Sequence, residues 1–305
     1  MHIFALALAF GLCACGKGYN SEQSTDSKKP DKAVAPALQS ESETDEAVFR
    51  VNARLYPDAR SALADVMLKT NPTVIGFGEF HQNTGTRKIR SALERFRQEL
   101  LPLVAAASSD LIIETWVPKG CGKVEQKVIR DVEKVTERPK ETEDETVRLI
   151  RASQQQGVSP HILDVKCEQY EALFDTDGEM DYLAMLTLVG TLMGDTAEKA
   201  LGYRKSNPAG NGRNRVLLYG GAIHNDLQFD DIWKECTFGP RLQQLVPKYI
   251  AVDLFVPEFI KNNSLIQTQT WYGLFEKHVS ADHVVLIEKA PNSFIIIFKS
   301  GIQNG

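Results

Sequence analysis

The chain has 305 residues, of which 43% are hydrophobic and 25% are charged. This length and composition allow a sizeable core, as one large domain or two small ones. The formal net charge is -5 and no block of basic residues is present, so composition excludes a general electrostatic attraction to nucleic acid. We expect a globular protein without a nucleic-acid partner.

The N-terminus carries the pattern of an export signal. Ile3–Leu12 is apolar but falls short of the roughly 20 residues that a bilayer span needs, and its length is typical of a signal peptide. The run ends in Leu12-Cys13-Ala14-Cys15-Gly16, which resembles a bacterial lipoprotein signal with cleavage after Ala14 and lipid on Cys15. An ordinary cleaved signal and an uncleaved hydrophobic start are the alternatives, because the first two residues lack Lys and Arg.

The next segment is polar and has almost no large apolar side chains up to residue 46. Such a segment cannot offset the entropy lost on ordering. We therefore predict a signal peptide over 1–15, a disordered tether over 16–46 and a single domain over 47–305. By resemblance to the lipoprotein pathway, Gly16 is compatible with sorting to the outer membrane. The predicted location is the bacterial cell envelope, at the outer membrane or cell surface, with membrane contact through the lipid on Cys15.

Apolar runs and helical spacing alternate from Ala47 onward. The predicted strands are Thr73–Phe77, Leu111–Thr115, His161–Val165, Val216–Tyr219 and Tyr249–Leu254. The predicted helices are Ser61–Lys69, Thr86–Ala107 and Tyr182–Met193, the last with an extension to Ala200 as an alternative. Alternating strands and helices predict an α/β fold with a mostly parallel sheet flanked by helices. Val284–Lys289 and Phe294–Phe298 predict a C-terminal antiparallel hairpin at an edge of that sheet.

Reactive side chains follow or end several of these strands. Glu79 and His81 follow the first strand, Glu114 ends the second, and His224 follows the fourth. Asp164 lies in the third strand. Ligands of such sheets bind outside the carboxyl ends of the strands. We therefore expect these side chains to share one site.

Each of these residues also has a purely structural interpretation. His81 could cap a helix or fill the core, and Glu79 could be a surface residue of the turn. Asp164 could bond nearby backbone amides, and Asn225 and Asp226 could cap a turn or line the site. Glu114 follows Leu111-Ile112-Ile113, so a buried carboxylate there needs a partner. Their common edge favours a functional role for Glu79, His81, Glu114 and His224.

Three short motifs together resemble the erythromycin esterase and ChaN-like superfamily, including the related TIKI/TraB proteins with two Gly-x-x-His motifs. The motifs are Gly78-Glu79-Phe80-His81, Ile112-Ile113-Glu114 and Gly221-Ala222-Ile223-His224. ChaN-like proteins are the nearer match, because they include bacterial lipoproteins and have these motifs in this order. Gly220-Gly221 stands where Gly-Asn is common in that group, and the region around 120–157 looks like a helical insertion.

The resemblance implies different activities in different branches. Esterase-like members resemble hydrolases that use Glu and His to activate water, TIKI-like members resemble metal-dependent proteases, and ChaN is similar to a haem-binding lipoprotein. The implied catalytic residues, which would also hold any divalent metal, are Glu79, His81, Glu114 and His224. For haem, Tyr219 and His224 are the axial candidates, and Gly78 and Gly221 are the motif glycines expected beside a ligand. A small molecule, a peptide or haem is therefore the expected ligand, and a non-catalytic envelope scaffold is a further alternative.

Two cysteines follow predicted strands that are consecutive along the chain. Cys121 comes after the second strand and Cys167 after the third, so the two thiols can meet if these strands are adjacent, and an oxidising compartment would favour the bond. We predict a disulfide between them, which would fix the inserted segment beside the site. Val124, Val128, Val132 and Val135 have helical spacing in that segment, which fits either a lid or a solvated charged helix.

Overall fold

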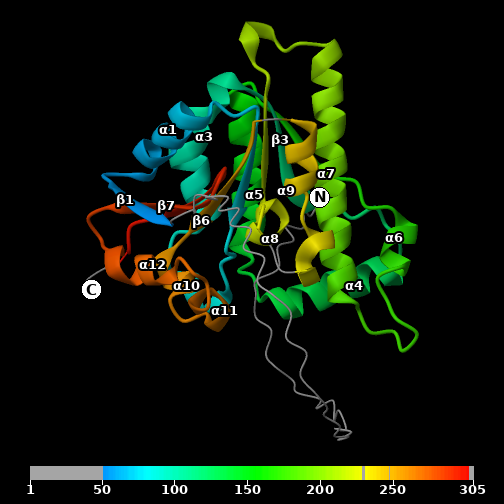
Figure 1. The fold of residues 1–305 in the computed structure, drawn as a ribbon. Coiled ribbons are helices and arrows are strands. Elements are labelled where there is room, and N and C mark those ends of the chain that lie inside the picture. Colours follow the sequence, from blue (N-terminus) through cyan, green and yellow to red (C-terminus); the bar gives the residue numbers. More distant parts are fainter. Residues whose placement is uncertain (1–50, 229–230, 247, 302–305) are drawn as a thin grey trace, which may run out of the picture. The chain divides into compact units, whose positions relative to one another are not determined.

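The computed structural model describes residues 51–228, 231–246 and 248–301 (Figure 1). The predicted signal peptide, the lipid-attachment residue Cys15 and the tether over 16–46 lie outside the described residues. Among the described residues, no helix is both long and apolar enough to cross a membrane.

The described strands form one eight-stranded sheet in the order β1-β7-β8-β6-β2-β5-β3-β4. β7 is antiparallel to both of its neighbours, and the remaining pairings are parallel. The fold is therefore the predicted α/β class, with a mostly parallel sheet and a C-terminal antiparallel hairpin. The strands are β1 (Asn52–Tyr56), β2 (Val74–Glu79), β3 (Ser108–Trp116), β4 (Ser159–Leu163), β5 (Arg215–Gly221), β6 (Tyr249–Phe255), β7 (Val284–Ala290) and β8 (Ser293–Ile297).

Side chains of neighbouring residues in a strand point to opposite faces of the sheet. Both faces of this sheet carry apolar side chains, and helices cover both. Phe77 of β2 packs in one apolar cluster, whereas Val74 packs in the other. The first cluster includes side chains of α1 (Ala59–Thr70), α2 (Ala92–Arg95), α3 (Leu101–Val104), α5 (Glu141–Gln155), α10 (Pro257–Ile260) and α12 (Tyr272–His278). The second includes side chains of α4 (Lys123–Thr136), α6 (Cys167–Glu171), α7 (Tyr182–Ser206) and α9 (Gly239–Leu245).

Local signals explain where the predicted elements begin and end. Asp58 caps α1 by accepting a hydrogen bond from the backbone of Ser61, and Asn71 ends this helix in the left-handed region at φ 42°. Asp181 caps α7 in the same way. β1 was not predicted from the sequence, and it pairs with β7 as the outermost strand beyond the hairpin.

The predicted helix over Thr86–Ala107 is not continuous. Ser91 caps a new start by accepting from the backbone of Glu94, so α2 begins at Ala92. A π-helical turn, η2 (Phe96–Leu100), follows, and then α3 and a short 3₁₀ turn, η3 (Ala105–Ala107). The apolar spacing over this stretch correctly predicted a buried face, but it predicted neither the Ser91 cap nor the change of helix type.

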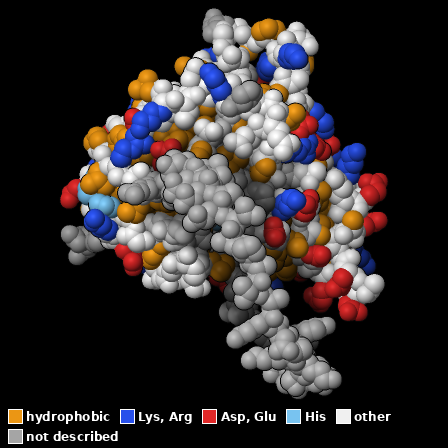
Figure 2. Space-filling model, viewed as in Figure 1, with side chains coloured by type: hydrophobic (Ala, Val, Ile, Leu, Met, Phe, Trp, Pro, Cys, Tyr) orange, Lys and Arg blue, Asp and Glu red, His pale blue; other side chains and the backbone are white. Residues whose placement is uncertain are grey.

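The insertion around 120–157 forms α4 and α5. α4 buries Val128 and Val132 in the second cluster and exposes Glu133 and Lys134. Figure 2 shows acidic side chains gathering at the lower right, where Figure 1 places α4 and α6. α4 is therefore a packed amphipathic helix rather than a fully solvated one.

Strand order brings the predicted site residues to one edge. β5 lies between β2 and β3, and Glu79 of β2 is in register with Gly221 of β5. Glu79 is the last residue of its strand rather than part of the following turn. Glu114 lies near the end of β3, on the other side of β5.

Candidate active site

Glu79 and His81 form a buried pair at the end of β2. Oε1 of Glu79 lies 2.7 Å from Nδ1 of His81, and Oε2 accepts a hydrogen bond of 2.6 Å from the Tyr219 hydroxyl. Burial alone would raise the pKa of Glu79, but His81, the Arg138 charge and the Tyr219 hydrogen bond outweigh it and lower the pKa. Glu79 is therefore a carboxylate with both oxygens engaged.

The His81 imidazole is uncharged. Burial, followed by the nearby Arg138 charge, lowers the pKa of His81 to about 3. Nδ1 lies within hydrogen-bond distance of Oε1 of Glu79, which can only accept, and of Nη2 of Arg138, which can only donate. We assign the one proton of the uncharged imidazole to Nδ1, directed to Glu79. Nε2 is buried and has no hydrogen-bond partner in the described part of the chain. The lone pair of Nε2 is therefore free.

Glu114 has a different environment from Glu79. Its Oε2 accepts a hydrogen bond from the Gly221 backbone amide, whereas its Oε1 is buried and has no hydrogen-bond partner among the described residues. Burial raises the pKa of Glu114 to about 8. At neutral pH this side chain is therefore a protonated carboxylic acid.

His224 lies in the short helix α8 (Ala222–Asn225), which follows β5. Its Nδ1 lies 2.7 Å from the Cys236 carbonyl oxygen, which can only accept, so Nδ1 carries the proton. Nε2 then faces Oε1 of Glu114 at 3.8 Å. Burial lowers the pKa of His224 to about 4, so this ring is also uncharged.

These side chains converge on Gly221. A Cβ at this position would lie 2.8 Å from Nε2 of His81, 3.5 Å from Oε2 of Glu114 and 3.7 Å from Cδ2 of His224. A Cβ on Gly220 would collide with the Glu114 carboxylate. The structure thus brings together all four predicted catalytic residues, and two glycines leave the room for them.

Arg138 is a site residue that the sequence analysis missed. It lies between α4 and α5, and its Nη2 is 3.2 Å from Oε1 of Glu79 and also contacts Nδ1 of His81. Its side chain is only 10% exposed. The available signal was Arg138-Pro139 inside the insertion, because the residue before a proline avoids helix and marks a turn.

The comparisons with known proteins give little. No protein-family model matches the chain, and no curated protein matches it. A solved structure, that of the type III effector HopBA1, is similar with 11% sequence identity and a TM-score of 0.43, over 82% of this chain and 98% of that chain. No match connects the chain to erythromycin esterase or ChaN-like proteins, so that resemblance stays a prediction.

The site does not present an assembled set of metal ligands. No group of three or more His, Cys, Asp or Glu in the described ranges is arranged to hold a metal ion. Glu79, one of the four predicted ligands, already uses both oxygens for His81 and Tyr219, and the guanidinium of Arg138 adds a competing positive charge beside it. A divalent metal at this site therefore stays a prediction.

The haem candidates are committed to other contacts. The Tyr219 hydroxyl donates to Glu79, and the Nδ1 of His224 donates to a backbone carbonyl, with its Nε2 facing Glu114. Axial binding by Tyr219 would have to break its hydrogen bond. Haem binding likewise stays a prediction, without a feature of the site that favours it.

Several predicted or alternative residues have structural roles. Asp164 is exposed and pairs with Lys119, so it lies outside the Glu/His cluster. A Cβ on Gly78 would meet the Cα of Ala222 at 2.5 Å, so this glycine allows α8 to pack on β2. Asn225 donates to the Gly76 carbonyl. Asp226, together with Asp253, pairs with the partly buried Lys289.

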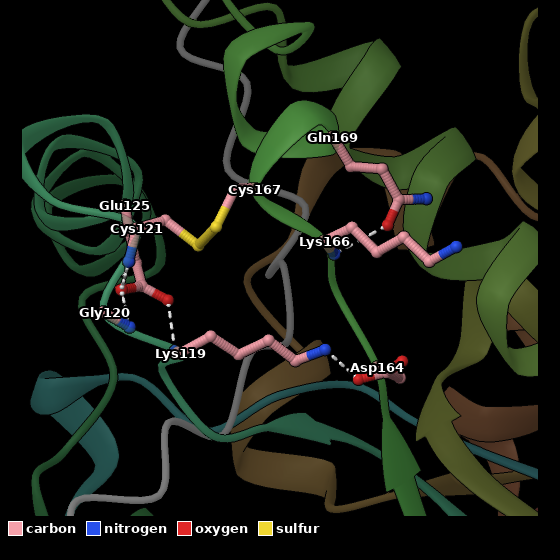
Figure 3. The surroundings of a disulfide bond; sticks show 8 residues. All are labelled: Lys119, Gly120, Cys121, Glu125, Asp164, Lys166, Cys167 and Gln169. Atoms are coloured by element: carbon pink, nitrogen blue, oxygen red, sulfur yellow. Dashed lines mark hydrogen bonds and ion pairs between the residues drawn. A yellow bond between two sulfur atoms is a disulfide. The ribbon is translucent and has the colours of Figure 1, made fainter.

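The predicted disulfide is present. Cys121 and Cys167 are bonded, with a separation of 46 residues along the chain (Figure 3). The buried carboxylate of Glu125 accepts hydrogen bonds from the backbone amides of Lys119, Gly120 and Cys121. The turn into α4 is therefore fixed both covalently and by a carboxylate, and it joins the insertion to the start of α6.

Proposed function

We propose that this chain is a hydrolase of the bacterial cell envelope, related to the erythromycin esterase and ChaN-like superfamily. One observation carries the proposal: His81 is held by Glu79 through Nδ1, and its free Nε2 shares the space around Gly221 with the protonated Glu114. Hydrolysis by an activated water requires a general base and a general acid that face the same small space.

His81 is the base in this proposal. Nε2 takes a proton from water as the water oxygen attacks an electrophilic carbon of the substrate. Glu79 keeps the ring in the tautomer that leaves Nε2 bare, and it stabilises the imidazolium that forms, as a carboxylate beside a catalytic histidine does.

Glu114 is the acid. Its proton passes to the leaving group or to the oxygen that becomes negative, and the buried surroundings keep that proton on the carboxyl group at neutral pH until it is transferred. His224 lies beside the unpartnered oxygen of Glu114. Its Nε2 faces that oxygen, which places His224 to orient the Glu114 carboxyl group.

The envelope location rests on two features. The first is the lipoprotein-like signal that ends at Cys15. The second is the Cys121–Cys167 bond, because disulfides persist in oxidising compartments such as the periplasm or cell surface.

The test is hydrolysis of p-nitrophenyl esters and a fluorogenic peptide library by the purified protein and its His81→Gln variant. We expect kcat/KM to fall by about 10²–10⁴-fold, the usual contribution of a general base. His161→Gln is the matched control, because His161 also bonds a carboxylate, Asp110, but lies in β4. Equal activity of His81→Gln and wild type would contradict the proposal.

The same preparation separates the alternatives. A stoichiometric divalent metal by elemental analysis that is lost in a His81→Ala, His224→Ala double variant would support the metal-dependent branch. A Soret band after haem addition would support haem binding. If no probe is turned over and neither metal nor haem binds, the non-catalytic envelope scaffold is the alternative that remains.

A further inference from the structure

Arg138 reaches the site from the tip of the α4–α5 hairpin. α4 ends at Thr136 and is capped by Glu137, which adopts the left-handed region at φ 44° and donates its backbone N–H to the Glu133 carbonyl. Pro139 follows Arg138 directly and restricts its backbone to an extended conformation. This sharp reversal turns the Arg138 side chain inward.

The tip is held on the site by contacts on both sides. The Thr84 backbone N–H donates to the Glu137 carbonyl at 2.9 Å, and Thr84 belongs to the loop that follows His81. The Ser91 hydroxyl donates to Glu145 of α5. Arg138 is therefore placed by the hairpin and by the loop after β2 together.

The guanidinium acts on one oxygen of the catalytic pair. Nη2 of Arg138 hydrogen-bonds both Oε1 of Glu79 and Nδ1 of His81. A guanidinium can only donate, so with the His81 proton directed from Nδ1 to Glu79, Oε1 is the acceptor that the ring and Arg138 share. A buried carboxylate without a counter-charge is strongly unfavourable. Arg138 supplies that charge and also fixes the oxygen that orients the imidazole.

We propose that Arg138 is a positioning residue, which holds the Glu79 carboxylate against Nδ1 of His81 and so keeps Nε2 free as the base. The kinetic part of this inference rests on the proposed function. The structural part concerns only the tautomer and orientation of His81.

A double-mutant cycle on kcat tests the route of action. We expect Arg138→Gln and Glu79→Gln each to lower kcat by about 10- to 100-fold, the cost of a misplaced catalytic group. Because Arg138 acts through Glu79, the double variant should be no slower than Glu79→Gln alone. Arg148→Gln is the control, since Arg148 lies in α5 and is 46% exposed, and it should leave kcat unchanged. Additive losses in the double variant would overturn the inference.

Nitrogen-15 NMR of the imidazole provides a readout that needs no turnover. Wild type should show His81 with its proton on Nδ1, identified by the signal lost in His81→Gln. Arg138→Gln should show a larger Nε2–H share, and an unchanged spectrum or a smaller Nε2–H share would overturn the inference. If Arg138→Gln does not fold, Arg138→Lys keeps the charge but lacks the planar fork, and it should retain Nδ1–H with an intermediate kcat.

The two proposals fail in different ways. A wild type that hydrolyses no probe but shows the expected Arg138-dependent tautomer overturns the proposed function alone. The role of Arg138 alone is overturned if wild type is active and depends on His81, but the kcat losses of Arg138→Gln and Glu79→Gln are additive and Arg138→Gln leaves the His81 tautomer unchanged.

Discussion

At the scale of residues, the site depends on two glutamates in opposite environments. Glu79 meets His81, Tyr219 and Arg138, and the pKa of this carboxylate is lowered despite its burial. Glu114 accepts a hydrogen bond from one backbone amide, that of Gly221, and burial raises its pKa to about 8. Pairs of groups whose pKa values are moved apart in this way are typical of acid and base assignments in active sites.

The first prediction concerns pH. Activity requires uncharged His81, whose pKa is about 3, and protonated Glu114, whose pKa is about 8. We expect kcat/KM to rise as pH rises through the lower value and to fall as pH rises through the upper value. Glu114→Gln should remove the alkaline fall at a lower overall rate, whereas Glu168→Gln, which changes an exposed carboxylate of α6, should keep it. A wild-type profile that stays flat above pH 8 would contradict the acid role.

The second prediction concerns Gly221. Its φ is -66°, which alanine adopts without strain, so Gly221→Ala changes mainly the space beside Nε2 of His81. We expect a loss of about 100-fold in kcat/KM, as for other small displacements in active sites. Gly202→Ala in α7 is the control, because a Cβ there meets nothing within 4 Å. It should keep activity and stabilise the fold by about 0.5–1 kcal/mol. Full activity of Gly221→Ala would show that this space is not where the substrate binds.

At the scale of elements, the α4–α5 insertion is part of the site rather than an appendage. It leaves the sheet after β3, begins at the Cys121–Cys167 disulfide and reaches back to Glu79 through Arg138. A covalent bond at its base restricts the unfolded chain and limits where the hairpin can dock. The structure therefore connects the disulfide to the site through one helix.

The third prediction is that loss of this disulfide affects both stability and turnover. We expect the Cys121→Ser, Cys167→Ser double variant to lose about 2–4 kcal/mol of unfolding free energy, measured by urea denaturation, and to have a lower kcat. Reductant should lower the unfolding free energy and the kcat of wild type to those of the variant, and it should leave both values of the variant unchanged. Unaltered stability after reduction would contradict the prediction.

At the scale of the whole molecule, the order of the strands assembles the site. Glu79 and Tyr219 are separated by 140 residues, yet they lie on neighbouring strands and share a hydrogen bond. β3 then adds Glu114 from the other side of β5. Carboxyl ends of adjacent parallel strands form one edge, which is where ligands of such sheets bind.

The fourth prediction concerns the anchor, which lies outside the described residues. We expect Cys15→Ser to move the protein from the membrane fraction to the soluble fraction and to abolish labelling by a radioactive fatty acid. Cys13→Ser is the control and should remain lipidated, because Cys13 precedes the predicted cleavage point. A Cys15→Ser protein that fractionates like wild type would favour an ordinary cleaved signal or an uncleaved hydrophobic start.

The sequence alone predicted the α/β class, the principal strands, the disulfide pairing and the meeting of Glu79, His81, Glu114 and His224 at one edge of the sheet. These follow from local patterns: apolar runs, glycines after strands, and reactive side chains at strand ends. Arg138 and β1 were decided by the tertiary structure, whereas the start of α2 at Ala92 has a local signal, the Ser91 cap, that the helical spacing did not reveal. Arg138 lies 59 residues from its partner Glu79, and no local pattern encodes a contact that depends on how a hairpin docks. The opposite pKa shifts of Glu79 and Glu114 have the same origin, because burial and neighbouring charge exist only once the chain has folded.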